Sequence, residues 1–160
     1  MKLKKILRIR EYTKHLPRWR DKLKVSIAWL IVGGIPICFK RIRAMMRKIL
    51  GSWMKRDDMI VDGCRYKLAD LDSVYIINPA YEDALKGWFN PKRGEVLVDV
   101  GANIGKYTIP FAKRGVKVIA IEPNPKFFDV LQKNIRINRV EANVKAVSYT
   151  HLTLPTICSV

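Results

Sequence analysis

The sequence predicts an α/β fold in which short parallel strands alternate with helices and a glycine-rich turn follows the first of these strands. Three observations predict this fold. The segment Val96–Val100 is a short apolar run rich in β-branched residues, as expected for a strand buried on both faces of a parallel sheet. The turn Gly101–Gly105 breaks this run, and apolar residues then recur at helical spacing. A second buried strand, Val116–Ile121, ends in the acidic residue Glu122.

The order strand, glycine-rich turn and helix is typical of a nucleotide-binding unit. A ligand can approach the backbone closely at Gly101, because glycine has no Cβ, and the helix beyond presents free N–H groups. In such units an acidic residue about 20 positions past the turn binds ribose hydroxyls, and Glu122 stands near that distance. The alternative is structural: Gly101 and Gly105 form a tight turn with close helix packing, and Glu122 is a solvated strand end.

The residues after Glu122 predict a further helix and a third strand. Asn124 is a good N-cap, and Pro125 suits the first helical position. Apolar residues follow on one helical face, namely Phe128, Leu131 and Ile135. A third strand is expected to start over Asn143–Ala146. Right-handed crossovers place the three strands in the order 3-2-1, with both helices on one face of the sheet.

Two regions precede this unit. Residues 1–56 are a basic leader with 17 Lys or Arg against Glu11 and Asp21, so they carry +15 of the chain's net charge of +17. The segment Met59–Leu68 is predicted to form a hairpin with Asp62-Gly63 as its turn. A short strand is then expected over Ser73–Ile77 and a short helix over Tyr81–Phe89.

The leader contains an uncharged run and a basic amphipathic segment. The run over residues 25–39 is shorter than the roughly 20 residues that a membrane span needs. Residues 39–54 are predicted to form an amphipathic helix with one apolar face among lysines and arginines, a pattern that suits an anionic membrane surface. Two alternatives remain: the helix packs on the domain with a solvated basic face, or it binds RNA, for which no base-stacking platform is evident.

A family resemblance indicates which class of nucleotide ligand the turn binds. The turn is D-x-G-x-x-x-G from Asp99 to Gly105, whereas a dinucleotide site has G-x-G-x-x-G. The run DVGANIGKYT, then AIEPNP and L-x-x-NI-x-x-N, resembles the FkbM-type methyltransferase family over about Val74–Lys145. The resemblance implies S-adenosylmethionine as the cofactor and strands 1–3 of a seven-strand Rossmann-like sheet. It also implies a cofactor site formed by Asp99, Gly101, Ala102, Asn103, Gly105, Glu122 and Pro123.

The resemblance implies an S-adenosylmethionine-dependent enzyme, and the first expected function is O-methylation of a small molecule or glycan. The expected setting is cytoplasmic, with the leader (residues 1–56) at an anionic membrane surface. An RNA methyltransferase is the alternative, because NP-x(5)-L-x-x-NI-x-x-N also recurs in tRNA-modifying enzymes. The EPNP strand end and the absence of an RNA-binding domain weigh against it, so nucleic acid is not the expected partner. A non-catalytic fragment that binds nothing well is the third alternative.

No catalytic residue can be named from the sequence. Residues 1–146 show no paired carboxylates, no nucleophile beside a base and no metal cluster. Methyl transfer to a hydroxyl needs positioning and a base, and that base is not identified. The three cysteines, Cys38, Cys64 and Cys158, have neither metal-ligand nor disulfide spacing, so no metal is expected.

The tail of the chain departs from the αβ pattern. Residues 147–156, VSYTHLTLPT, can be back-translated into a sequence that resembles the transposase end and primer site of a common sequencing-library adapter. Residues from about 147 to 160 are therefore expected to be a read-through artefact. The expected organisation is a leader at 1–56, a hairpin and helix segment at 57–90, the N-terminal half of a methyltransferase domain at 91–146, and the tail at 147–160.

Overall fold

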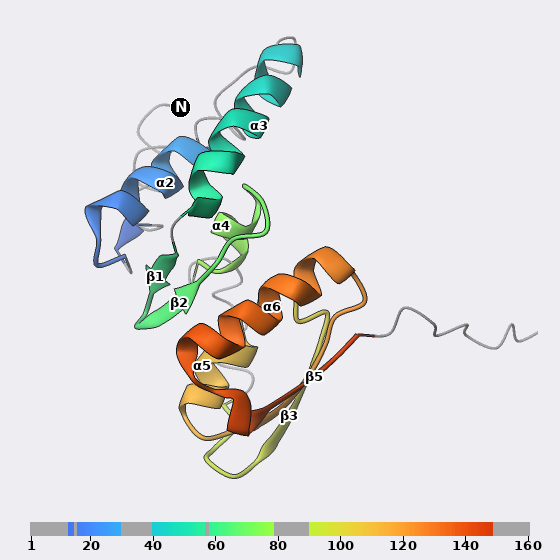
Figure 1. Cartoon of the computed structure of the whole chain (residues 1–160). Helices are drawn as coiled ribbons and strands as arrows, with labels where there is room; N and C mark the ends of the chain where they lie inside the picture. Colours follow the sequence, from blue (N-terminus) through green and yellow to red (C-terminus); the bar gives the residue numbers. More distant parts are fainter. Residues whose placement is uncertain (1–12, 15, 30–39, 57, 79–89, 149–160) are drawn as a thin grey trace, which may run out of the picture.

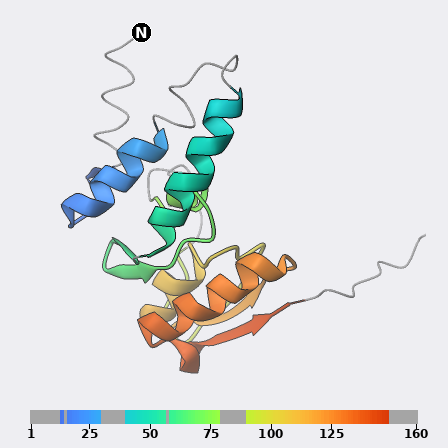
Figure 2. The ribbon, with the colours of Figure 1, turned by 45° about the horizontal axis from the view of Figure 1, so that its top comes forward.

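The computed structural model describes residues 13–14, 16–29, 40–56, 58–78 and 90–148 (Figure 1). The elements, in chain order, are α2 (Trp19–Trp29), α3 (Lys40–Arg56), β1 (Met59–Val61), β2 (Cys64–Tyr66), α4 (Ser73–Ile76), β3 (Val96–Val100), α5 (Thr108–Lys113), β4 (Lys117–Ile121), α6 (Pro125–Asn138), a 3-10 turn (Glu141–Asn143) and β5 (Val144–Val147). The helices α2 and α3 lie at one end of the molecule, and the β1–β2 hairpin lies between them and the sheet (Figures 1 and 2).

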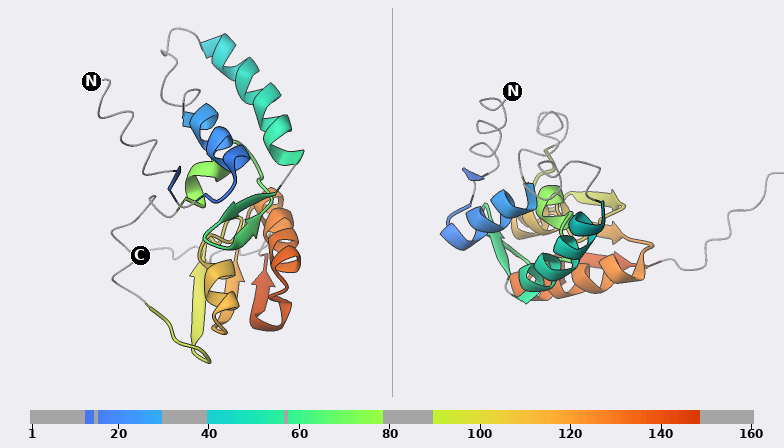
Figure 3. Two further views of the ribbon diagram at one scale, coloured as in Figure 1. Left: turned by 90° about the vertical axis from the view of Figure 1, so that its left-hand side faces the viewer. Right: turned by 90° about the horizontal axis from the view of Figure 1, so that it is seen from above.

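The strands β3, β4 and β5 form a parallel sheet in that order, with helices α5 and α6 as the crossovers. Both helices lie on one face of the sheet (Figure 3), so the expected strand order and crossover geometry are confirmed. Between the helices and the sheet lies a core whose side chains are almost fully buried. Its central members are Ile104, Ile109, Val118 and Leu131.

The opposite face of the sheet is bare at β3. Val96, Val98 and Val100 are 63%, 54% and 69% exposed. The prediction that this strand is buried on both faces is therefore wrong for the described part of the chain. The physical reason is that α5 and α6 cover one face only, and β3 pairs with β4 alone, which makes it an edge strand.

The hairpin is confirmed, and its turn has the expected conformation. Asp62 and Gly63 have φ values of 45° and 74°, so both lie in the left-handed region that a two-residue turn requires. The strand predicted over Ser73–Ile77 is wrong, because this segment forms helix α4. Asp70 accepts hydrogen bonds from the backbone N–H and the hydroxyl of Ser73 at 3.0 and 2.8 Å, which closes a turn where a strand would be extended. The helix predicted over residues 81–89 lies outside the described residues.

The leader packs against the hairpin instead of standing apart. The buried side chains of Leu16, Val25 and Ala28 belong to the same core cluster as Met59 and Val61. Since the leader contributes to this core, it is part of the folded structure and not only a charged extension.

Polar contacts fix the leader helices in place. The carboxylate of Asp21 is fully buried, and it accepts hydrogen bonds from the Arg18 guanidinium at 2.9 Å and from the Ile60 N–H at 3.1 Å. The Lys24 ammonium lies 5.9 Å from the centroid of the Trp53 ring, which joins α2 to α3. The amphipathic segment predicted over residues 39–54 is helical from Lys40. In the described part of the chain, no helix is both long and apolar enough to cross a membrane.

Two asparagines on α6 hold the hairpin against the sheet unit, and we call Asn134 and Asn138 the asparagine clamp. Asn134 is fully buried; its Oδ1 accepts from the Lys67 N–H at 2.6 Å, and its Nδ2 donates to the carbonyls of Lys67 and Ile104 at 3.1 and 2.8 Å. Asn138 repeats this pairing one turn later, with the N–H and carbonyl of Arg65 at 2.9 and 2.6 Å. The clamp thus binds the backbone at and just beyond β2 much as a neighbouring strand would.

Candidate functional site

The carboxyl ends of β3 and β4 meet at one edge of the sheet, where ligands bind in open α/β folds. The backbone N–H groups of Gly101 and Ala102 both donate to the Ile121 carbonyl, at 2.9 and 3.0 Å. Ala102 is 3% exposed and belongs to the core. These contacts fix the start of the glycine turn against the end of the neighbouring strand.

Glu122 joins the glycine turn to the loop that precedes α6. Its side chain is only 5% exposed. Oε2 accepts a hydrogen bond from the Asn103 N–H at 2.8 Å, and Oε1 accepts one from the Asn124 N–H at 2.8 Å. The alternative of a solvated strand end is therefore excluded. A carboxylate has about four acceptor sites, so each oxygen retains capacity for a further donor such as a ribose hydroxyl.

The two glycines of the turn serve different purposes. Gly105 has a φ of 98°, and a Cβ placed there would lie 2.9 Å from Ile109 Cγ1 and 3.0 Å from Leu131 Cδ1. Gly101 has a φ of 78°, and a Cβ there would meet nothing within 4 Å. Close helix packing therefore explains Gly105. At Gly101 the backbone faces open space, which is the condition for close approach of a ligand.

Asp99 adds a second carboxylate to this edge. Its Oδ2 accepts hydrogen bonds from the Thr108 N–H at 3.1 Å and the Thr108 hydroxyl at 2.6 Å. Burial raises the pKa of Asp99; the bonds from Thr108 oppose that change, and the charge of Glu122 adds to it. The sequence analysis did not identify Thr108 as part of the site. The signal that it contacts Asp99 is its position at the first residue of α5.

All the predicted site residues gather at this edge. Asn103 holds the turn with a φ of 51°, a left-handed conformation that asparagine tolerates, and its side chain accepts from the Ile104 N–H at 2.9 Å. Pro123 is exposed and lies between Glu122 and the helix N-cap Asn124. Two carboxylates beside an open backbone favour a ligand that carries hydroxyl donors and positive charge. Methionine sulfonium nucleosides have both features, so the residues present fit S-adenosylmethionine.

A parallel strand–helix–strand–helix–strand unit with this turn and a buried acidic strand end defines a Rossmann-like S-adenosylmethionine-dependent methyltransferase domain. Residues 60–154 match the profile of the TRM5/TYW2 methyltransferase domain. The match covers more than half of the chain, and the chain belongs to this family. It includes the glycine turn, Glu122 and the asparagine clamp, and it begins inside the hairpin.

Individual relatives agree with the family. A tRNA (guanine(37)-N(1))-methyltransferase of Saccharomyces cerevisiae is 32% identical over 123 residues, which are 72% of this chain and 24% of the yeast protein. The enzyme of the same name from Candida albicans (strain WO-1) is 38% identical over 85 residues, 52% of this chain and 18% of that protein. The crystal structure of P. horikoshii TYW2 in complex with MeSAdo shares 34% identity over 57% of this chain and 34% of that chain, with a TM-score of 0.46. The chain thus spans less than a quarter of the length of these two curated relatives.

These findings confirm some expectations and correct others. The Rossmann-like fold is confirmed by the parallel sheet and its helical crossovers. The methyltransferase class, and with it S-adenosylmethionine as the family's cofactor, is confirmed by the match to the family. The assignment to the FkbM-type family is wrong, because the TRM5/TYW2 domain matches instead. O-methylation of a small molecule or glycan is wrong for the same reason. The expectation against a nucleic-acid partner is also wrong, since the curated relatives are named as tRNA methyltransferases. Nothing in the comparisons supports membrane association of the leader.

Proposed function

We propose that this chain provides the S-adenosylmethionine-binding part of a tRNA methyltransferase that modifies the N1 atom of a guanine. The observation that carries the proposal is the family match over the turn and Glu122, the two features that the structure brings together at one edge. The proposed ligand contacts are those of the seven predicted site residues, with Glu122 as the acceptor for the ribose hydroxyls. The proposal keeps the division of the chain into segments that end at residues 56, 90 and 146. Strand β5 extends one residue past the last of these boundaries, to Val147.

The charge distribution supports RNA as the substrate. Helix α3 contains seven Lys or Arg and no acidic residue. A protein that binds RNA needs such positive charge, since neutralising phosphates provides much of the affinity. The leader packs on the hairpin through its apolar side and leaves Lys48 and Arg56 exposed. The basic leader that the sequence assigned to a membrane surface is thus suited to the substrate of the matched family.

The proposed reaction transfers one methyl group from the sulfonium of S-adenosylmethionine to guanine. The bond between the methyl carbon and the sulfonium sulfur breaks, the bond between that carbon and guanine N1 forms, and the sulfur becomes neutral. The N1 proton passes to a base, and no described residue is assigned that role. The described residues bind and orient the donor: Glu122 accepts hydroxyl donors, and Gly101 admits the ligand to the backbone.

Donor binding is tested by calorimetric titration of the chain with S-adenosylmethionine. Gly101→Val fills the open space beside the turn, and we expect at least a tenfold loss of affinity. Glu122→Gln keeps the shape of the side chain but removes the charge, and we also expect a loss of roughly tenfold, since a charge-assisted hydrogen bond contributes about 1.5–3 kcal/mol. Arg139→Ala is the control, because Arg139 is the exposed C-cap at the opposite end of α6 from Asn124. Unchanged affinity in both site variants, or preference for a nicotinamide cofactor, would refute the donor site.

Acceptor choice is tested in the protein encoded by the complete gene. A tRNA transcript with guanine at position 37 is compared with the same transcript carrying adenine there, using S-adenosylmethionine labelled in its methyl group. We expect label in the guanine transcript only. Equal labelling of both transcripts, or labelling of a sugar acceptor alone, would overturn the guanine assignment.

A further inference from the structure

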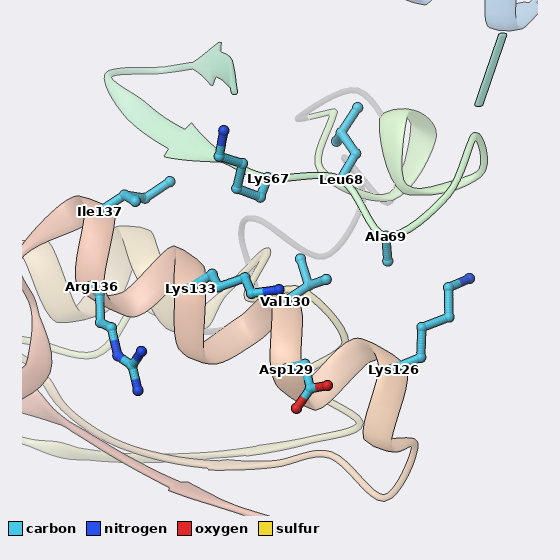
Figure 4. A pocket seen from close by; sticks show the side chains of 9 residues that line it. All are labelled: Lys67, Leu68, Ala69, Lys126, Asp129, Val130, Lys133, Arg136 and Ile137. Carbon is cyan, nitrogen blue, oxygen red and sulfur yellow. The ribbon is translucent and has the colours of Figure 1, made fainter. Parts of the chain in front are cut away.

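We propose that the groove between α6 and residues 67–69 binds the phosphate backbone of the RNA substrate; this inference rests on the proposed function. The groove has a volume of about 670 Å³. Lys67, Leu68 and Ala69 form one side and residues of α6 form the other, although the side chains of Asp129 and Arg136 project from α6 away from residues 67–69 (Figure 4). The clamp residue Asn134 on α6 hydrogen-bonds the N–H and the carbonyl of Lys67, so it ties one side of the groove to the other.

The lining of the groove is strongly cationic. Four of its nine residues are Lys or Arg, and Asp129 is the single acid among them. Lys126 is held by Asp70, with 2.6 Å between Nζ and Oδ2. Lys133 and Arg136 are exposed, and their side chains form no hydrogen bond or ion pair with any residue that the structure describes. Two full positive charges are therefore available to an anionic ligand.

The spacing of these cations suits a polyanion. With a rise of 1.5 Å per residue, Lys126 and Arg136 are about 15 Å apart along the axis of α6. Phosphates of one strand in a duplex follow one another about every 3.4 Å along the axis, so the row of cations can span several of them. A free nucleotide or a single phosphate would occupy only part of this length.

The groove also leads to the proposed methyl-donor site. Lys126 is the second residue of α6, and the N-cap Asn124 donates its backbone N–H to Glu122 at 2.8 Å. An RNA strand that lies along the groove therefore passes the carboxyl edge of the sheet, where the methyl group would be delivered. The groove would thus hold the RNA strand that carries the target base next to the donor site.

A lipid surface is a poorer occupant than RNA. Helices that bind membranes insert exposed apolar side chains below a ring of cations. The apolar residues of the groove, Val130 and Ile137, are partly covered, and Leu68 is 3% exposed. The lining therefore offers charges on a recessed apolar floor, to which extended sugar and phosphate groups can fit.

The test uses the 160-residue chain and a fluorescently labelled, unmodified tRNA transcript. Binding is measured by anisotropy at several salt concentrations for the wild type and for the double variant Lys133→Glu with Arg136→Glu. The double variant Lys92→Glu with Lys145→Glu is the charge-matched control, because both lysines are exposed and lie outside the groove. S-Adenosylmethionine titrations and vesicles of phosphatidylcholine with phosphatidylserine are run in parallel.

We expect the groove variant to lose at least tenfold in tRNA affinity and its slope of log affinity against log salt to become shallower by about 1–2. Donor affinity should not change, because neither residue belongs to the donor site. Equal losses in groove and control variants would overturn the groove and leave the proposed function standing. A loss confined to vesicle binding would identify a lipid site instead. A wild-type chain that binds no tRNA would refute the groove, while a normal donor titration would still support the methyltransferase assignment.

Discussion

The carboxyl edge of the sheet and the asparagine clamp both belong to the matched methyltransferase domain, yet they use polar groups in opposite ways. At the edge, Glu122 binds two backbone N–H groups and keeps acceptor capacity, while Gly101 faces open space. In the clamp, Asn134 uses its oxygen and its NH₂ group on the protein's own backbone and is fully buried. Spare hydrogen-bonding capacity beside open space separates a ligand site from an architectural contact, although both contain motif residues.

The sharpest way to test this difference is to remove the clamp. Asn134→Ala leaves the N–H and the carbonyl of Lys67 and the carbonyl of Ile104 without their partner inside the protein. Each buried unsatisfied group costs about 1–3 kcal/mol, so we expect the free energy of unfolding to fall by about 4 kcal/mol in urea titrations. Asn138→Ala, at a half-buried position, should cost about 1 kcal/mol. A loss below 1 kcal/mol for Asn134→Ala would mean that the clamp is dispensable.

Gly101 and Gly105 allow the contrast between ligand site and structural contact to be tested within one turn. Gly105→Ala places a Cβ against Ile109 and Leu131 at positive φ, and we expect a loss of about 3 kcal/mol in stability from backbone strain and overpacking. Gly101→Ala meets open space and should cost only the strain, about 1 kcal/mol. Thermal unfolding with and without S-adenosylmethionine separates the effects. The ligand should stabilise the Gly105 variant as it does the wild type and stabilise the Gly101 variant less. The reverse order of stability losses would contradict the assignment of packing to Gly105.

The smallest expected effect is on how the free energy of unfolding depends on pH, through the carboxylates of Asp99 and Asp70. Burial raises the pKa of Asp99 above 3.8 in the folded state. The folded protein therefore keeps the Asp99 carboxyl protonated to a higher pH than the unfolded chain does. The contribution of Asp99 to the free energy of unfolding therefore falls as pH rises from 3.8 through its folded pKa, and Asp99→Asn should remove this fall. Unfolding titrations between pH 3.5 and 7 measure the difference. Identical pH profiles for variant and wild type would mean that Thr108 fully compensates for burial.

Asp70 is the control with the opposite sign. Burial alone would raise its pKa, but the hydrogen bonds from Lys126 and Ser73 outweigh burial and hold the pKa below 3.8. Its ionised form stabilises the fold above pH 3.8, and this contribution is lost as pH falls through the folded pKa. Asp70→Asn should therefore weaken the protein at neutral pH and flatten its loss of stability in acid.

The sequence was sufficient for the strands of the sheet, their order and the gathering of site residues at one edge. Each of these follows from local signals: an apolar run, a glycine turn, and the N-cap Asn124 with Pro125 after it. The partners of Glu122 could not be predicted, because they are backbone N–H groups whose positions depend on the path of two loops. The strand expected over Ser73–Ile77 failed because a side-chain contact from Asp70 outweighed the β propensity of a short segment.

The family could not be decided from the motifs, and the reason is physical. The turn from Asp99 to Gly105 and the end of β4 form the proposed site of the methyl donor, which different methyltransferases share. The acceptor places few demands on these residues. The asparagine pair at i and i+4 carried a usable signal, since an amide buried on the packed face of a helix needs hydrogen-bond partners. The sequence does not show that these partners are backbone groups of Arg65 and Lys67, because that depends on how the hairpin packs beside α6.

The bare valines of β3 set how this chain behaves at high concentration. Among the described residues, β3 pairs with β4 alone, so its outer N–H and C=O groups and its three exposed valines offer a template onto which a second copy can add its own β3. Growth by such addition depends steeply on protein concentration, so light scattering should rise with concentration in the wild type. Val98→Lys, which places a charge in the middle of that face, should keep the chain monomeric without disturbing the helices on the other side. The strand that leads into the proposed donor site is therefore also the strand at which we expect copies of the chain to associate.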